Sequence, residues 1–208
     1  MKIDTSIDHR DRLMIVFTLI ILGFLSLLYW AQNRTPDILN HPNNRSEIIV
    51  FGDSLAAGVG SDENEGFTKG LEFSLNRQIT VLGVSGDTTR DGLNRIEEVT
   101  ERDAQIVLIS LGGNDFIQRV PEETVRKNMD KIISKIQNSG AMVMVLGAPG
   151  YRGLYKQVAE DHKAAYVSNI LKGLIGRDAY MSDPIHPNNV GYHKISERIA
   201  PELKKFIE

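Results

Sequence analysis

The sequence of 208 residues contains no cysteine. This absence excludes disulfide bonds, thiolate metal sites and a cysteine nucleophile, although it does not identify a cellular compartment. An excess of one charge is also lacking, because the formal net charge is −3 and the lysines and arginines are scattered along the chain. A nucleic-acid-binding protein needs a basic patch, so we exclude nucleic acid as a partner.

Several common functional motifs are absent as well. The chain has no GxSxG elbow, no P-loop and no complete GxGxxG fingerprint. Readings as an α/β-hydrolase, an NTPase or a dinucleotide-binding protein therefore lack their required parts. No pair among the five histidines has the spacing of a dedicated zinc site, so we predict no bound metal.

One long apolar run occurs, near the N-terminus. Residues 13–31 carry no charge and as a helix could cross a hydrocarbon core of about 30 Å. A cleaved signal peptide is the alternative, but its apolar region is normally shorter and ends in small residues, whereas Leu28, Tyr29 and Trp30 occupy that end. We predict an uncleaved transmembrane helix over 13–31 after a tail, residues 1–12, whose basic residues slightly favour a cytoplasmic location.

The segment that follows, residues 32–46, is polar and contains two prolines, which is typical of an extended linker. We expect the folded domain to span 47–208. Nearly continuous apolar runs within it suit strands buried on both faces of a parallel sheet. These runs are 48–51, 79–84, 106–111 and 142–146, with a weaker fifth at 164–167.

Helical patterns separate the apolar runs. The clearest begins at Pro121, carries an apolar stripe from Val125 to Ile136 and ends at Gly140. Shorter stripes occur within 67–75, 93–99 and 192–203, and Pro201 is expected to bend or interrupt the last one. Alternating strands and helices predict a doubly wound, three-layer α/β domain.

Three short polar motifs directly follow the first three predicted strands. They are Gly-Asp-Ser at 52–54, Ser-Gly-Asp-Thr at 85–88 and Gly-Gly-Asn-Asp at 112–115. In a doubly wound sheet, ligands bind outside the carboxyl ends of the strands near a switch point. With a strand order of 2-1-3-4-5, one pocket could receive all three motifs. Each motif alone is only a turn or a loop, and it is their order on successive strands that indicates a site.

The residue types in these motifs suit acyl transfer. A serine hydroxyl, that of Ser54, needs a base to become nucleophilic, and the developing oxyanion needs hydrogen-bond donors fixed before the reaction. Ser54 and Gly86 can offer backbone N–H groups, and the Asn114 side-chain amide can offer a third donor.

A candidate base lies near the C-terminus, in the segment Asp183-Pro184-Ile185-His186-Pro187. Both Asp183 and His186 precede a proline, which biases each towards extended backbone. The spacing of three could let the Asp183 carboxylate accept from one imidazole nitrogen while the other nitrogen faces Ser54. A histidine beside proline in a loop is otherwise an exposed bystander, but the chain needs one base.

Four blocks in this order resemble those of the SGNH/GDSL hydrolase superfamily, in particular its branch of lysophospholipase L1, thioesterase I and arylesterases. The blocks are GDS at 52–54, SGDTT at 85–89, LGGND at 111–115 and DPIHP at 183–187. The resemblance implies a catalytic Ser54, Asp183 and His186, oxyanion donors at Ser54, Gly86 and Asn114, and a flavodoxin-like strand order. It also implies hydrolysis without a metal or cofactor.

The substrate is less defined than the mechanism. We expect a small acyl ester, thioester or lysophospholipid, bound in an apolar pocket by a protein anchored in a bacterial inner membrane with its domain on the extracytoplasmic side. A carbohydrate O-acetyl esterase, or a tethered binding protein without turnover, remains an alternative.

Asp53 and Asp115 could imitate a glycosidase carboxylate pair, but we expect them to brace their neighbours. The pocket candidates are Leu55, Ala56, Val59, Phe116, Ile117, Tyr151 and Ile185.

Overall fold

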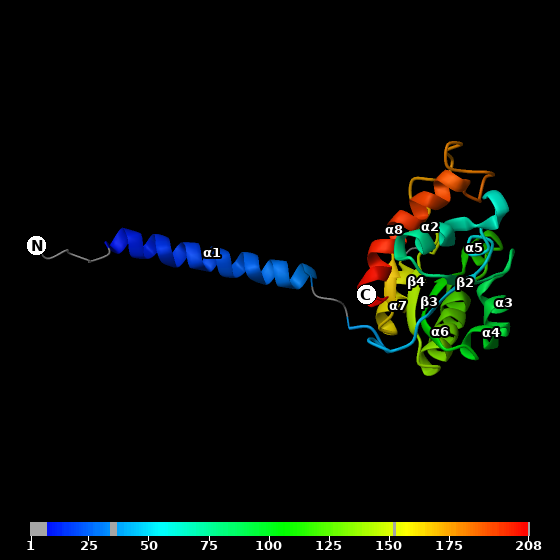
Figure 1. Cartoon of the computed structure of the whole chain (residues 1–208), viewed down its shortest axis with the longest axis horizontal. Coiled ribbons are helices and arrows are strands. Elements are labelled where there is room, and N and C mark those ends of the chain that lie inside the picture. The colour runs from blue at the N-terminus through cyan, green and yellow to red at the C-terminus, as the bar shows by residue number, and fades with distance from the viewer. Residues whose placement is uncertain (1–7, 34–36, 152, 208) are drawn as a thin grey trace, which may run out of the picture. The chain divides into compact units, whose positions relative to one another are not determined.

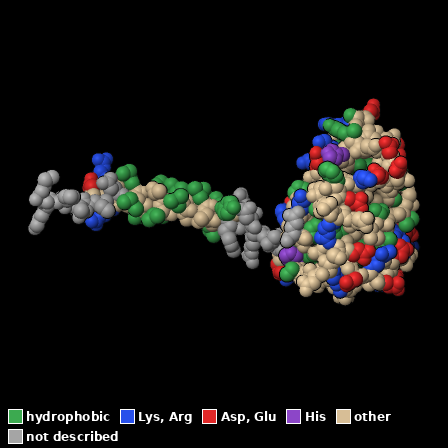
Figure 2. All heavy atoms as spheres, in the orientation of Figure 1, with side chains coloured by type: hydrophobic (Ala, Val, Ile, Leu, Met, Phe, Trp, Pro, Cys, Tyr) green, Lys and Arg blue, Asp and Glu red, His purple; other side chains and the backbone are tan. Residues whose placement is uncertain are grey.

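The computed structural model describes residues 8–33, 37–151 and 153–207, and the chain divides into two compact units between Pro36 and Asp37. The first unit contains helix α1 (His9–Asn33). By length and composition, its segment Arg12–Tyr29 could cross a membrane, and hydrophobic side chains cover much of its visible face (Figure 2). The side chain of Trp30, the first seven residues of the predicted tail, and residues 34–36 of the predicted linker lie outside the described residues.

The second unit is built on a five-stranded parallel sheet with the order β2-β1-β3-β4-β5, which confirms the predicted strand order. In the register of the central strands, Gly52 of β1 lies beside Gly83 of β2 and Ser110 of β3. The carboxyl ends of these three strands therefore finish level with one another. The strands are β1 (Glu47–Gly52), β2 (Ile79–Gly83), β3 (Ala104–Ser110), β4 (Met142–Leu146) and β5 (Ala165–Val167).

Helices cover both faces of the sheet, so the three-layer prediction is confirmed (Figure 1). Successive residues of a strand point to opposite faces, and in β1 the pair Ile48 and Val50 joins one core while Ile49 and Phe51 join the other. The first face is covered by α2 (Gly66–Leu75) and α8 (Asn189–Ile207), and the second by α3 (Thr89–Asn94), α4 (Glu97–Thr100), α6 (Glu122–Asn138) and α7 (Leu154–Asp161). Two short helices complete the domain, η1 (Asp62–Asn64) and α5 (Gly113–Ile117).

Pro201 does not interrupt the last helix, although an interruption is one of the two predicted outcomes; the other, a bend, stays a prediction. Proline removes one intrahelical hydrogen bond and normally kinks or ends a helix, yet α8 continues through it to Ile207. Ile199 and Leu203, on either side of the proline, are fully buried in the same core. Burial of this apolar stripe offsets the lost backbone hydrogen bond.

The predicted linker is in large part folded onto the domain. Ile38 is 5% exposed and belongs to the core. The Asn40 amide donates to the carbonyls of Gln137 (2.8 Å) and Ala141 (2.9 Å), and the Arg45 guanidinium donates to the carbonyl of Ser139 (2.8 Å). The domain thus begins at Asp37, ten residues before the predicted boundary. Polar side chains typical of a linker instead satisfy carbonyl groups near the amino end of β4.

Candidate active site

Ser54 follows the end of β1, in a tight turn that contacts with the neighbouring backbone stabilise. A Cβ on Gly52 would lie 2.1 Å from the Ser110 carbonyl oxygen, so only glycine fits between β1 and β3. The chain then turns at Asp53, whose N–H donates to the same carbonyl (3.0 Å) and whose Oδ1 accepts from the N–H of Leu55 (3.0 Å). Ser54 is 8% exposed at this position.

Ser54, His186 and Asp183 form a continuous hydrogen-bonded line. The distance from His186 Nε2 to Ser54 Oγ is 3.0 Å, and the distance from His186 Nδ1 to Asp183 Oδ2 is 2.6 Å. Burial alone would raise the pKa of Asp183, but hydrogen bonds from His186 and Ile185 outweigh it and the pKa lies below its ordinary value. A carboxylate that stays ionised can hold the imidazole with its proton on Nδ1, which leaves Nε2 free to accept from the serine.

Local backbone geometry explains how the histidine is presented. An isolated bridge joins Met181 to Pro187, and the N–H of Ser182 donates to the His186 carbonyl (2.9 Å). These contacts close residues 181–187 into a compact loop directly before α8. Fifteen per cent of the His186 side chain is exposed, so the ring is largely shielded from water.

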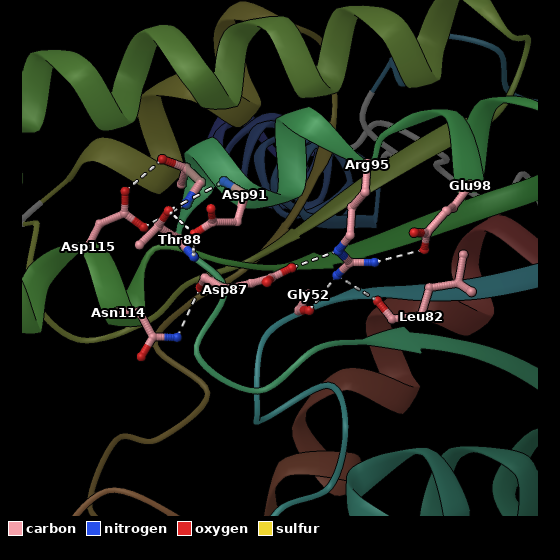
Figure 3. A network of polar contacts seen from close by, with 10 residues as sticks. Gly52, Leu82, Asp87, Thr88, Asp91, Arg95, Glu98, Asn114 and Asp115 are labelled. Carbon is pink, nitrogen blue, oxygen red and sulfur yellow. Dashed lines mark hydrogen bonds and ion pairs between the residues drawn. The ribbon is translucent and has the colours of Figure 1, made fainter.

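The second and third motifs contact each other, and the third lines the same cavity as Ser54. Gly86 has φ of 90°, a conformation that L side chains rarely adopt. It lies next to Asp87 in the turn before α3. The Asn114 Nδ2 donates to the Asp87 carbonyl (2.9 Å; Figure 3). An amide nitrogen carries two hydrogens, so one remains for a ligand, and both Ser54 and Asn114 line the same cavity.

The two aspartates next to these groups hold the backbone. Asp115, which is 1% exposed, accepts from the N–H (2.8 Å) and the hydroxyl (2.7 Å) of Thr89. Burial raises the pKa of Asp53 to about 7, and the hydrogen bond from Leu55 opposes that rise only in part. Of the two, only Asp53 reaches the cavity, so they do not face each other across it as a glycosidase pair would.

The cavity beside Ser54 has a volume of about 220 Å³ and a mostly apolar wall. Four predicted residues line it, namely Leu55, Phe116, Ile117 and Ile185. The other candidates lie elsewhere. The Tyr151 hydroxyl donates to the Val120 carbonyl (2.7 Å), and its ring packs edge to face against Phe116. Ala56 is buried in the core. The Val59 carbonyl accepts from the Tyr192 hydroxyl. Within the described part of the chain, no group of three His, Asp or Glu side chains is placed to hold a metal ion.

Comparison with known proteins identifies the family. Residues 50–194 match the model of the GDSL-like lipase/acylhydrolase family. The chain belongs to this family.

Esterase TesA of Pseudomonas aeruginosa is 28% identical over 207 residues, covering 91% of this chain and 98% of that protein. An arylesterase of Vibrio mimicus is 30% identical over 179 residues, covering 77% and 90%. A crystal structure of TesA superposes with a TM-score of 0.70 at 29% identity, covering 77% of this chain and 99% of that one. The predicted resemblance is confirmed, and this GDSL protein is an ester-hydrolysing enzyme.

Sequence reasoning missed part of this GDSL enzyme's pocket. Ala148 and Pro149 follow β4, and Leu171 and Ile175 lie in a turn-rich segment after β5. The rule that ligands bind at the carboxyl ends of strands could have found the first pair. Neither a motif nor a periodicity marks the second pair, which reaches the cavity only through tertiary packing.

Proposed function

We propose that this GDSL enzyme cleaves esters through a covalent acyl-enzyme formed on Ser54. The observation that carries the proposal is the line from Ser54 Oγ through His186 to Asp183, at 3.0 and 2.6 Å. Ser54 Oγ attacks the ester carbonyl carbon while its proton passes to His186 Nε2. The same proton then goes to the leaving alcohol as its bond to carbon breaks. Water, deprotonated by His186, then attacks the acyl carbon. As the bond from this carbon to Ser54 Oγ breaks, His186 returns the proton to Oγ and the acid is released.

The negative oxygen of each tetrahedral intermediate needs donors that are in place beforehand. In the proposal these donors are the N–H groups of Ser54 and Gly86 and the amide of Asn114. The hydrogen bond from Asn114 to the Asp87 carbonyl (2.9 Å) supports this role, because it sets the plane of the amide.

The proposed substrates are esters or thioesters with an apolar acyl part, such as aryl esters or lysophospholipids. Support comes from the apolar cavity wall and from the large side chains at its edge: Phe116, Ile117, Ile175 and Ile185 are each about half exposed. A carbohydrate O-acetyl esterase, the alternative substrate class, would need polar groups to bind sugar hydroxyls. We also propose that α1 is an uncleaved membrane anchor that keeps the catalytic domain on the extracytoplasmic side.

Covalent labelling tests the mechanism. Full-length protein in detergent is treated with a fluorescent fluorophosphonate, and we expect one label per chain that is lost in Ser54→Ala. Ser74→Ala, which changes an exposed serine on α2, is the matched control and should label normally. Undiminished labelling or turnover of Ser54→Ala would overturn the proposal. A panel of acyl p-nitrophenyl esters, lysophospholipid and acetylated sugar then separates the substrate classes.

A further inference from the structure

Arg95 contacts residues close in sequence to the proposed oxyanion donors and serves none of the steps above. It follows α3, and 15% of its side chain is exposed. Its Nε donates to Asp87 Oδ2 (2.6 Å) and its Nη1 to Glu98 Oε2 (3.1 Å; Figure 3). The flat guanidinium also lies over the ring of Phe51, at 4.4 Å from its centroid. Two of its nitrogens and one face are therefore engaged.

The remaining nitrogen of Arg95 joins two strand ends. Its Nη2 donates to the main-chain carbonyls of Gly52 (2.9 Å) and Leu82 (3.1 Å), which lie in β1 and β2. Gly52 stands two residues before Ser54. The guanidinium thus holds the end of the strand that carries the nucleophile and the first oxyanion donor.

Asp87 connects the same guanidinium to the other two donors. Its side chain binds Arg95, and its carbonyl accepts from the Asn114 amide (2.9 Å). Its peptide neighbour is Gly86. The local fold supports this position, because Thr88 caps α3 through a reciprocal hydrogen-bond pair with Asp91.

We propose that Arg95 is a positioning residue that keeps the three oxyanion donors aimed at one point. The inference rests on the proposed function, since it presumes that these donors stabilise a tetrahedral intermediate. Only a planar fork with fixed donors reaches a carboxylate and two carbonyls at once. Lysine has one flexible ammonium and cannot hold the same three acceptors in this geometry.

The test compares Arg95→Met and Arg95→Lys in full-length protein with Arg102→Met. Arg102 is a matched control because its guanidinium contacts only Glu98 O and Glu47 Oε1 in the described structure, on a partly exposed side chain. Steady-state kinetics, the inhibition constant of an alkyl trifluoromethyl ketone and thermal melting are measured for each variant. The ketone forms a reversible tetrahedral adduct and so reports the oxyanion site.

For both Arg95 variants we expect kcat to fall by about 10-fold or more, somewhat less than the 10²- to 10³-fold cost of deleting a donor. The inhibition constant of the ketone should rise by a similar factor while KM changes little. Arg102→Met should match the wild type. A folded Arg95→Lys with wild-type kcat would overturn the inference, and so would an effect confined to KM. Loss of folding in both variants would also overturn it, because the role of the arginine would then be structural.

Ser54→Ala separates this inference from the proposed function. If Ser54→Ala keeps its turnover, the covalent mechanism fails and the role of Arg95 falls with it. If Ser54→Ala is inactive while both Arg95 variants turn over normally, only the role of Arg95 is wrong.

Discussion

Asp183 contacts His186 twice, once at the backbone and once at the ring. Its Oδ1 accepts from the His186 N–H at 2.8 Å, and its Oδ2 lies 2.6 Å from the ring Nδ1. The N–H of Ile185 donates to Oδ1 as well (2.8 Å). The carboxylate therefore sets both the backbone of the loop and the orientation of the imidazole, although the two residues are only three apart.

Replacing Asp183 by asparagine should uncouple these two contacts. Asparagine can keep the backbone contacts through its carbonyl oxygen, but its amide then faces Nδ1 as a donor and favours the wrong imidazole tautomer. We expect kcat to fall on the order of 10³- to 10⁴-fold with an unchanged melting temperature. Kinetics with a p-nitrophenyl ester measure the loss, and a decrease below tenfold would argue against the tautomer role.

Ser54→Ala and His186→Ala should each lower kcat by roughly 10⁴- to 10⁶-fold, and the double variant by no more than either one, because the two groups act as a unit. His193→Ala is the matched control, since His193 is an exposed residue of α8 whose ring pairs with Glu197. Turnover of each purified variant gives the comparison. Additive losses in the double variant would mean that the two residues act separately.

Asp53 should make stability depend on pH. Its pKa is about 7 in the folded protein, whereas the ordinary value is 3.8. At a pH between these two values, the folded state keeps a proton that the unfolded state has released. The contribution of Asp53 to the free energy of unfolding therefore falls as pH rises from about 4 to 7 and stays low above that. The full change is on the order of 4 kcal/mol at most.

Asp53→Asn tests this dependence, because asparagine stays neutral and can still accept from the Leu55 N–H. We expect the variant to gain stability relative to the wild type at pH 8 and to gain none at pH 4. Urea unfolding at both values measures the difference. An equal difference between variant and wild type at the two pH values would show that Asp53 is not buried in its neutral form.

Phe116 should contribute to acyl-chain binding. It lines the cavity and is 51% exposed, so Phe116→Ala removes apolar contact from a bound chain, which is worth about 1–3 kcal/mol. We expect kcat/KM for octanoyl esters to fall by about tenfold and that for acetyl esters to change little. Phe73→Ala, which alters a 91% exposed phenylalanine of α2, should leave both unchanged. Equal losses on the two esters would place the acyl chain elsewhere.

Helix α1 should retain the enzyme in membranes. The segment Arg12–Tyr29 is apolar and long enough to span a bilayer, and a charged residue at the centre of such a helix costs about 2.5–3.5 kcal/mol. We expect full-length protein to stay in the membrane pellet after a high-pH carbonate wash, and a variant with Ile20→Lys and Leu22→Lys to be released. Thr18→Ser is the control. Release of the unaltered protein, or an N-terminus cleaved after α1, would contradict the anchor.

The confirmed predictions concern features that neighbouring residues encode together. The continuous apolar run at 106–111 marks a strand because every side chain of β3 is buried, and the stripe from Val125 to Ile136 marks α6 because its period matches a helix turn. The Asp183–His186 contact is likewise local, because the two residues are three apart. The predictions that fail are an interruption of the last helix at Pro201 and a linker over residues 37–46, where packing against distant elements outweighs the local preference.

From the sequence alone, the order of strands and polar motifs along the chain already predicts a doubly wound sheet with a serine, a histidine and hydrogen-bond donors at one edge. Tertiary structure alone decides that Ser54 and His186, 132 residues apart, meet at 3.0 Å, that Leu171 and Ile175 line the cavity, and that one arginine ties two strand ends to Asp87. The physical reason is that local patterns record which residues must be buried or turned, whereas a contact between remote residues depends on how complete layers pack.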